Sequence, residues 1–181
     1  MHFRIISYYT PKYRNVALKL IASLEKLTVP FCVLGIEDQG SWDKNTHYKP
    51  HFILSQIEDL DAVVWTDADS IVRQEPLLFY DLNQYDIAFH RFKGQELLSG
   101  TVFFRNTPKT IELLHKWIEI NEQNPEQFDQ KNLDLAISCI DNLKIYTLPP
   151  EYVCIFDLSR DYYGGMTPVI EHFQASRDYR R

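Results

Sequence analysis

The strongest constraint on the fold is the segment Val63-Val64-Trp65-Thr66-Asp67-Ala68-Asp69, where an apolar run ends in two carboxylates one residue apart. A short apolar run of this kind is typical of a strand that is buried on both faces of a sheet. In open α/β folds, ligands bind in the crevice beyond the carboxyl ends of such strands. Because carboxylate oxygens are hard ligands, Asp67 and Asp69 predict a divalent metal held against a diphosphate.

The Asp-x-Asp pair also has other interpretations. Aspartate often caps the turn that follows a strand, without any further role. A calcium-binding EF-hand loop is excluded because Val72 occupies the sixth loop position, where that motif requires glycine. A phosphatase of the haloacid-dehalogenase type ends its first strand with such a pair, whereas here two predicted strands precede it.

The spacing of apolar residues predicts alternating strands and helices in the first part of the chain. Strands are expected over 3–8, 30–36 and 60–66, helices over 11–27 and 49–54, and a polar loop over 37–45. This order predicts parallel strands with right-handed crossovers. Further strands are expected over 85–90, 101–105 and 168–173, and helices over 108–121 and 129–140. We therefore predict an α/β fold, a Rossmann-like α/β/α sandwich with a parallel first half and a mixed second half, forming one domain over residues 1–181.

The composition agrees with one packed domain, since 45% of the 181 residues are hydrophobic and 14% are aromatic. The formal charge of −6 opposes non-specific binding to nucleic acid. This charge does not exclude a nucleic-acid substrate that is held only at the active site. Cys32, Cys139 and Cys154 lie in apolar contexts, which predicts buried free thiols and a reducing compartment. No segment reads as a signal peptide or approaches the ~18 apolar residues of a membrane span, so a soluble cytoplasmic protein is expected.

Four blocks follow one another along the chain. They are residues 63–69, the run Leu98-Ser99-Gly100-Thr101-Val102-Phe103-Phe104-Arg105-Asn106, the pair Asp129-Gln130, and Glu171-His172-Phe173. This succession resembles that of GT-A glycosyltransferases, namely the retaining nucleotide-diphospho-sugar transferases and, more distantly, the glycogenin-like enzymes. The resemblance covers about residues 3–173. The chain is short for this family and lacks its usual large acceptor-binding insertions.

The resemblance implies a GT-A-like fold and an enzyme, a retaining hexosyl- or pentosyltransferase. Its donor would be a nucleotide-diphosphate sugar, with a UDP-sugar as first choice. Its acceptor stays undetermined among a saccharide, a protein, a small molecule and a modified base.

The resemblance also implies the metal ligands. Asp69 would bind Mn²⁺ or Mg²⁺, Asp67 would face the metal or the donor ribose, and His172 would be the third protein ligand. Two carboxylates with one imidazole suit Mn²⁺ better than Mg²⁺. If His172 is a metal ligand, its protonation competes with metal binding, so donor affinity is expected to fall as the pH drops through roughly 6 to 7. The alternative is a structural histidine whose ring is satisfied by a neighbour.

The same resemblance places further residues near the donor. Asp129 and Gln130 would act at the reaction centre, although Asp129 at a helix start also fits a simple N-cap. Ser99 and Gly100 would let the backbone approach the sugar, or form an ordinary turn. Lys49, which precedes Pro50, would neutralise the diphosphate, or be a solvated lysine.

Residues near both ends of the chain complete the predicted donor site. Ser7, Tyr8 and Tyr9 end the first strand, where one tyrosine ring is expected to stack on the nucleoside base and the other to join the core. Arg177, Arg180 and Arg181 would hold the leaving diphosphate or form a solvated tail. The segment Tyr162-Tyr163-Gly164-Gly165 is expected to be a loop, either stacking on an acceptor or merely exposed.

The sequence thus predicts a metal-dependent glycosyltransferase, with two rival hypotheses. A phosphatase or nucleotidyltransferase would use the same carboxylates but release inorganic phosphate or pyrophosphate. A non-catalytic nucleotide-sugar binding protein would keep the fold alone, and the intact set of Asp67, Asp69 and His172 argues against it.

Overall fold

A computed structural model describes residues 1–179, and its centre is a six-stranded mixed sheet. The strand order is β2-β1-β3-β6-β5-β7, made of β1 (Phe3–Tyr9), β2 (Phe31–Gly35), β3 (Ala62–Thr66), β5 (Ile87–Phe92), β6 (Glu96–Arg105) and β7 (Ile145–Thr147). Strand β1 pairs in parallel with β2 and β3, whereas β6 runs antiparallel to β3 and β5. The predicted parallel first half and mixed second half are confirmed.

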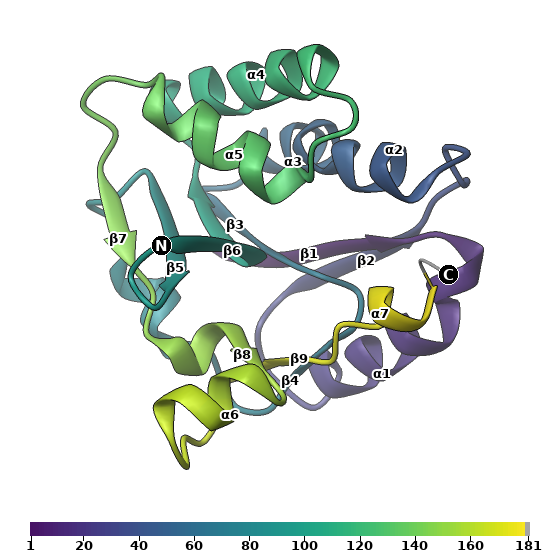
Figure 1. Cartoon of the computed structure of the whole chain (residues 1–181). Helices are drawn as coiled ribbons and strands as arrows, with labels where there is room; N and C mark the ends of the chain where they lie inside the picture. The colour runs from purple at the N-terminus through teal and green to yellow at the C-terminus, as the bar shows by residue number, and fades with distance from the viewer. Residues whose placement is uncertain (180–181) are drawn as a thin grey trace.

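Helices cover both faces of this sheet (Figure 1). On one face lie α2 (Trp42–His47), α3 (Lys49–Ile57), α4 (Pro108–Gln123) and α5 (Asp129–Ser138), and on the other lies α1 (Arg14–Leu24). Alternate residues of β3 point to opposite faces, so Val63 and Trp65 join one apolar cluster and Val64 joins the other. Strand β3 is buried along its whole length, as its continuous apolar run predicts.

A second, three-stranded sheet packs beside the first and has the order β4-β9-β8. It consists of β4 (Ser70–Val72), β8 (Cys154–Ile155) and β9 (Ile170–His172), and lies near α1, α6 (Leu158–Tyr163) and α7 (Ser176–Tyr179) (Figure 1). Strand β4 begins directly after Asp69 and runs antiparallel to β9, with Ser70 opposite His172. This pairing brings His172 close to the carboxylates of Asp67 and Asp69.

Three short 3-10 helices complete the described elements, at Pro11–Tyr13, Leu77–Asp81 and Pro150–Val153. The first leads into α1, which ends at Leu24 and not at residue 27 as expected. That residues 1–181 form one domain stays a prediction.

Three local expectations were wrong. The expected loop over 37–45 runs into helix α2, where Ser41 accepts a hydrogen bond from the Lys44 amide as an N-cap. Tyr162 and Tyr163 belong to α6 and not to a loop. All three cysteines are free, but Cys154 alone is buried, and Cys139 is exposed because it follows the last turn of α5 at the surface.

Candidate active site

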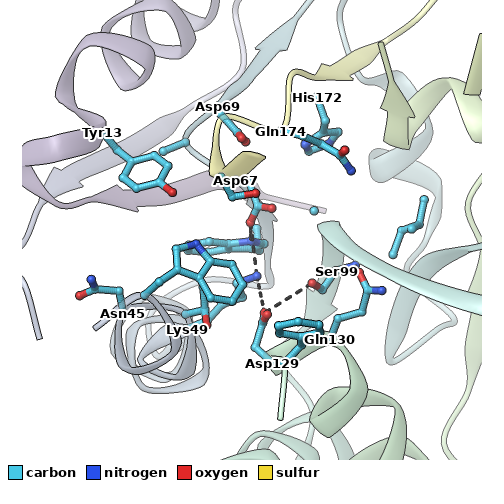
Figure 2. A pocket seen from close by; sticks show the side chains of 18 of the residues that line it. Tyr13, Asn45, Lys49, Asp67, Asp69, Ser99, Asp129, Gln130, His172 and Gln174 are labelled. Carbon is cyan, nitrogen blue, oxygen red and sulfur yellow. Dashed lines mark hydrogen bonds and ion pairs between the residues drawn. The ribbon is translucent and has the colours of Figure 1, made fainter. Parts of the chain in front are cut away.

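A pocket of about 350 Å³ opens beyond the carboxyl ends of β1 and β3 (Figure 2). Most of the residues predicted for the site line it, namely Tyr8, Tyr9, Lys49, Asp67, Asp69, Ser99, Gly100, Asp129, Gln130 and His172. These residues come from strands, helices and loops that are far apart in the sequence. The pocket therefore collects the predicted blocks at one edge of the sheet.

Lys49 lies buried at the centre of this group. Its Nζ is 2.7 Å from Asp129 Oδ2 and 3.3 Å from Asp67 Oδ1, and it lies 5.0 Å from the centroid of the Trp65 ring. Burial by itself would lower the pKa of Lys49, but the carboxylates of Asp129 and Asp67 raise it above its ordinary value. The lysine is therefore charged and paired, and the alternative of a solvated lysine is wrong.

The two carboxylates of the Asp-x-Asp pair are held differently. Asp67 Oδ1 accepts hydrogen bonds from Lys49 and from Trp65 Nε1, the latter at 2.9 Å. Asp69 Oδ2 accepts a hydrogen bond of 2.6 Å from the backbone amide of Ala175. Burial and the nearby charge of Asp67 raise the pKa of Asp69 to about 6. A bound cation would relieve this unfavourable environment.

His172 is buried, and its Nε2 lies 2.8 Å from Thr101 Oγ1. One ligand atom from each of Asp67, Asp69 and His172 lies within 4.8 Å of the other two. Burial lowers the pKa of His172 to about 4, so the imidazole is neutral at pH 7. The titration range of roughly 6 to 7 expected from the sequence is therefore wrong for the metal-free protein.

Gly100 provides the space that the His172 ring occupies. A Cβ atom at Gly100 would lie 3.0 Å from His172 Cε1 and 3.1 Å from His172 Nδ1. Both distances are shorter than ordinary van der Waals contacts. The sequence predicts that this glycine lets the backbone approach the sugar, whereas in the structure its missing side chain makes room for the histidine ring.

Asp129 and Gln130 begin helix α5 next to Ser99. Asp129 is buried, and its Oδ2 accepts hydrogen bonds from Lys49 and, at 3.4 Å, from Ser99 Oγ. Phe128 is the N-cap residue of this helix, so the interpretation of Asp129 as a simple N-cap is wrong. Gln130 Oε1 accepts from the Ser99 amide at 3.3 Å, and its Nε2 donates to Glu96 Oε1 at 2.9 Å.

The two tyrosines at the end of β1 have separate roles. Tyr8 is buried against Trp65, with ring centroids 5.0 Å apart, and its hydroxyl donates to the Asn45 carbonyl at 2.5 Å. Burial raises the pKa of Tyr8 well above its ordinary value, and the charges of Asp129 and Asp67 add to this shift. Tyr9 is partly exposed at the pocket. Tyr8 is thus the core residue of the pair.

Ser7 and Arg177 do not line the pocket. Ser7 is fully buried: it lies on the same face of β1 as Tyr9, but two residues before the end of the strand, where the pocket opens. Arg177 pairs instead with Asp157, with Nη1 2.5 Å from Oδ2. Arg180 and Arg181 lie outside the described residues.

Several residues that line the pocket were not predicted from the sequence, including Trp42, Asn45, Glu96, Phe128 and Gln174. Phe128 is adjacent to Asp129, which is the one sequence signal that could have indicated it.

A family model described as nucleotide-diphospho-sugar transferase matches residues 37–181. The chain belongs to the nucleotide-diphospho-sugar transferase family. No curated protein sequence matches this transferase significantly. None of the helices described for it combines the length and apolar character that crossing a membrane requires.

Solved structures of glycosyltransferases resemble the transferase in fold. A glycosyltransferase involved in glycosylation of the major capsid of PBCV-1 is 16% identical, with a TM-score of 0.79 over 99% of this chain and 97% of that one. Mouse xyloside xylosyltransferase 1 is 10% identical, with a TM-score of 0.61 over 97% and 99% of the two chains. The galactosyltransferase LgtC, solved with donor and acceptor sugar analogues, is 13% identical, with a TM-score of 0.60 over 94% and 87%. The fold is therefore GT-A, and the family makes the protein a glycosyltransferase.

Proposed function

We propose that the protein is a metal-dependent, retaining glycosyltransferase that uses Mn²⁺ or Mg²⁺ and a UDP-sugar donor. The observation that carries the proposal is the cluster of Asp67, Asp69 and His172, whose ligand atoms lie within 4.8 Å of one another. The buried pair of Lys49 and Asp129 lies in the same pocket. Retention of configuration rests on the resemblance to the retaining members of the family.

The residues of the cluster fit a divalent cation. Asp67 Oδ1 accepts hydrogen bonds from Lys49 and Trp65. Asp67 Oδ2 lies toward Gly100, 3.5 Å from the position that a Cβ atom of residue 100 would occupy. When His172 Nε2 carries the ring proton and donates a hydrogen bond to Thr101 Oγ1, the lone pair of Nδ1 is available to a metal. Two carboxylates with one imidazole favour Mn²⁺. When bound, the ion supplies Lewis-acid stabilisation of the charge on the departing UDP.

The chain's own residues would bind and orient the donor sugar. Lys49 and Ser99 hold the Asp129 carboxylate in place, so that its charge can stabilise positive charge developing at the anomeric carbon. The amide of Gln130 is oriented by Ser99 and Glu96. Tyr9 and Gly100 complete the proposed donor contacts, whereas Ser7 and Arg177 are left out because neither lines the pocket.

Two measurements test this function. UDP with Mn²⁺ should raise the melting temperature, and UDP with a chelator should raise it much less, because the diphosphate binds chiefly through the cation. A panel of UDP-sugars should then give UDP as the product. Release of inorganic phosphate or pyrophosphate would favour the phosphatase or nucleotidyltransferase alternative, and binding without turnover of any donor would favour a non-catalytic binding protein.

A cytoplasmic location is part of the proposal. It is supported by the three free thiols, since disulfides form mainly in oxidising compartments.

A further inference from the structure

Two aromatic side chains that were not predicted for the site lie together at the pocket. Trp42 is the first residue of α2, and Phe128 directly precedes Asp129 at the start of α5. Their ring centroids are 5.9 Å apart and the rings are nearly perpendicular, at 86°. Both line the pocket, and Phe128 is 46% exposed. A large apolar side chain exposed within a pocket is typical of a surface that a ligand covers.

A buried amide network fixes the two elements that carry these rings. Asn132, which is fully buried, donates from Nδ2 to Asn121 Oδ1 at 2.9 Å and accepts from Gln127 Nε2 at 2.8 Å. Asn121 Nδ2 donates to the carbonyl of His47, at 3.2 Å. His47 Nε2 lies 2.7 Å from the Gln127 carbonyl. The network therefore ties the end of α2 to the segment before α5, and it holds the two rings in a preset arrangement.

The charges around the pocket limit what this surface can bind. Among the described lining residues, Lys49 is the sole lysine or arginine, and its charge is matched by Asp67 and Asp129. Glu96 and Asp69 add negative charge. An anionic acceptor would be repelled, whereas the carboxylate of Glu96 and the amide of Gln130 suit hydroxyl groups.

We propose that the acceptor is a neutral saccharide whose C–H face packs on Phe128 and Trp42, so that one hydroxyl reaches the sugar held beside Asp129. This inference rests on the proposed function. In the transfer, the acceptor oxygen bonds to the anomeric carbon as the bond from that carbon to UDP breaks. The bonding pair leaves with UDP, and the hydroxyl proton passes to the departing phosphate oxygen.

Binding measurements on the whole chain with Mn²⁺ and UDP test the proposal. The probes are lactose, maltose, cellobiose and xylobiose, with an unsaturated glucuronic-acid disaccharide and a tyrosine-containing peptide for comparison. We expect at least one neutral disaccharide to bind more tightly than the acidic disaccharide or the peptide. Phe128→Leu and Trp42→Leu should each raise its dissociation constant roughly ten-fold, as expected when an aromatic face is lost.

Two variants serve as controls. Phe128→Tyr keeps an aromatic face and should keep saccharide affinity within about two-fold of wild type, by the same reasoning. Tyr162→Leu removes an aromatic side chain that is 51% exposed but outside the pocket, and should leave the affinity unchanged. Stabilisation by UDP and Mn²⁺ should persist in every variant.

The outcomes separate the two proposals. If wild-type protein gains no stability from UDP and Mn²⁺, the proposed function fails. If it gains stability but binds none of the neutral disaccharides, prefers the acid or the peptide, or binds equally well after Phe128→Leu, the acceptor inference is overturned.

Discussion

Lys49 and Asp129 form a buried ion pair across 80 positions of the sequence, with Lys49 Nζ 2.7 Å from Asp129 Oδ2. Their side chains are only 4% and 7% exposed. The same ammonium group contacts Asp67, so one cation links the carboxylate proposed at the reaction centre to one proposed at the metal. The pair thereby connects the first turns of α3 and α5 with the end of β3.

Replacing Lys49 by methionine should destabilise the protein strongly. The substitution leaves Asp129 buried without its cation, a change that typically costs about 3–5 kcal/mol. Urea denaturation in the presence of a chelator measures the effect. As a control, Lys116→Met removes a lysine from an exposed pair with Glu119 and should leave the denaturation midpoint nearly unchanged. Equal midpoints for wild type and Lys49→Met would contradict a paired, buried charge.

Replacing Asp69 by asparagine should stabilise the metal-free protein and abolish transfer. The pKa of Asp69 is raised to about 6, so ionising this group costs stability as the pH rises from about 4 through 6. Asp69→Asn removes that cost, and its advantage of about 1–3 kcal/mol should be absent near pH 4 and complete above pH 6. Saturating Mn²⁺ should reverse the order, because wild type alone keeps the full set of ligands. Melting temperatures with chelator and with Mn²⁺ provide the comparison, and identical rankings in both would refute it.

Replacing His172 by asparagine should have an effect on stability that depends on pH. At pH 7 the loss of the hydrogen bond to Thr101 and of packing should cost about 1–3 kcal/mol. The pKa of His172 is lowered to about 4, so wild type loses stability as the pH falls from 6.5 through 4, and the asparagine variant lacks this loss. The difference between the two proteins should therefore shrink on acidification in chelator. A difference that stays constant between pH 7 and 4.5 would count against the buried neutral imidazole.

Replacing Gly100 by alanine should weaken Mn²⁺ binding by displacing the His172 ring. The added methyl group would lie 3.0 Å from His172 Cε1, which forces a shift costing about 1–3 kcal/mol. We expect manganese affinity, measured by electron paramagnetic resonance titration, to fall about ten-fold, which corresponds to 1.4 kcal/mol. Gly165→Ala is the matched control, since among the described residues no heavy atom beyond its chain neighbours lies within 4 Å of the added Cβ. The role assigned to Gly100 would be wrong if both variants bound Mn²⁺ like wild type.

The sequence by itself determined the parallel start of the sheet and the position of the Asp-x-Asp pair. Strand β3 is continuously apolar, and α1 repeats its apolar residues at helical spacing. Both patterns are local, so residues that are close together in the sequence are enough to predict these elements. The paired carboxylates follow β3 directly and therefore had to lie at its carboxyl end. The resemblance to the family supplied His172, Asp129 and Gln130 as candidates, and the fold brings all three to the pocket.

Tertiary structure alone decided how these residues meet. Strands β4 and β8 have three and two residues, too few for any periodic pattern, yet the pairing of β4 with β9 sets His172 beside Asp69. The contact of Lys49 with Asp129 and the meeting of Trp42 with Phe128 depend on how helices pack over the sheet. Such contacts join residues far apart in the chain, and their free energy comes from burial and charge pairing that exist only once the chain has folded.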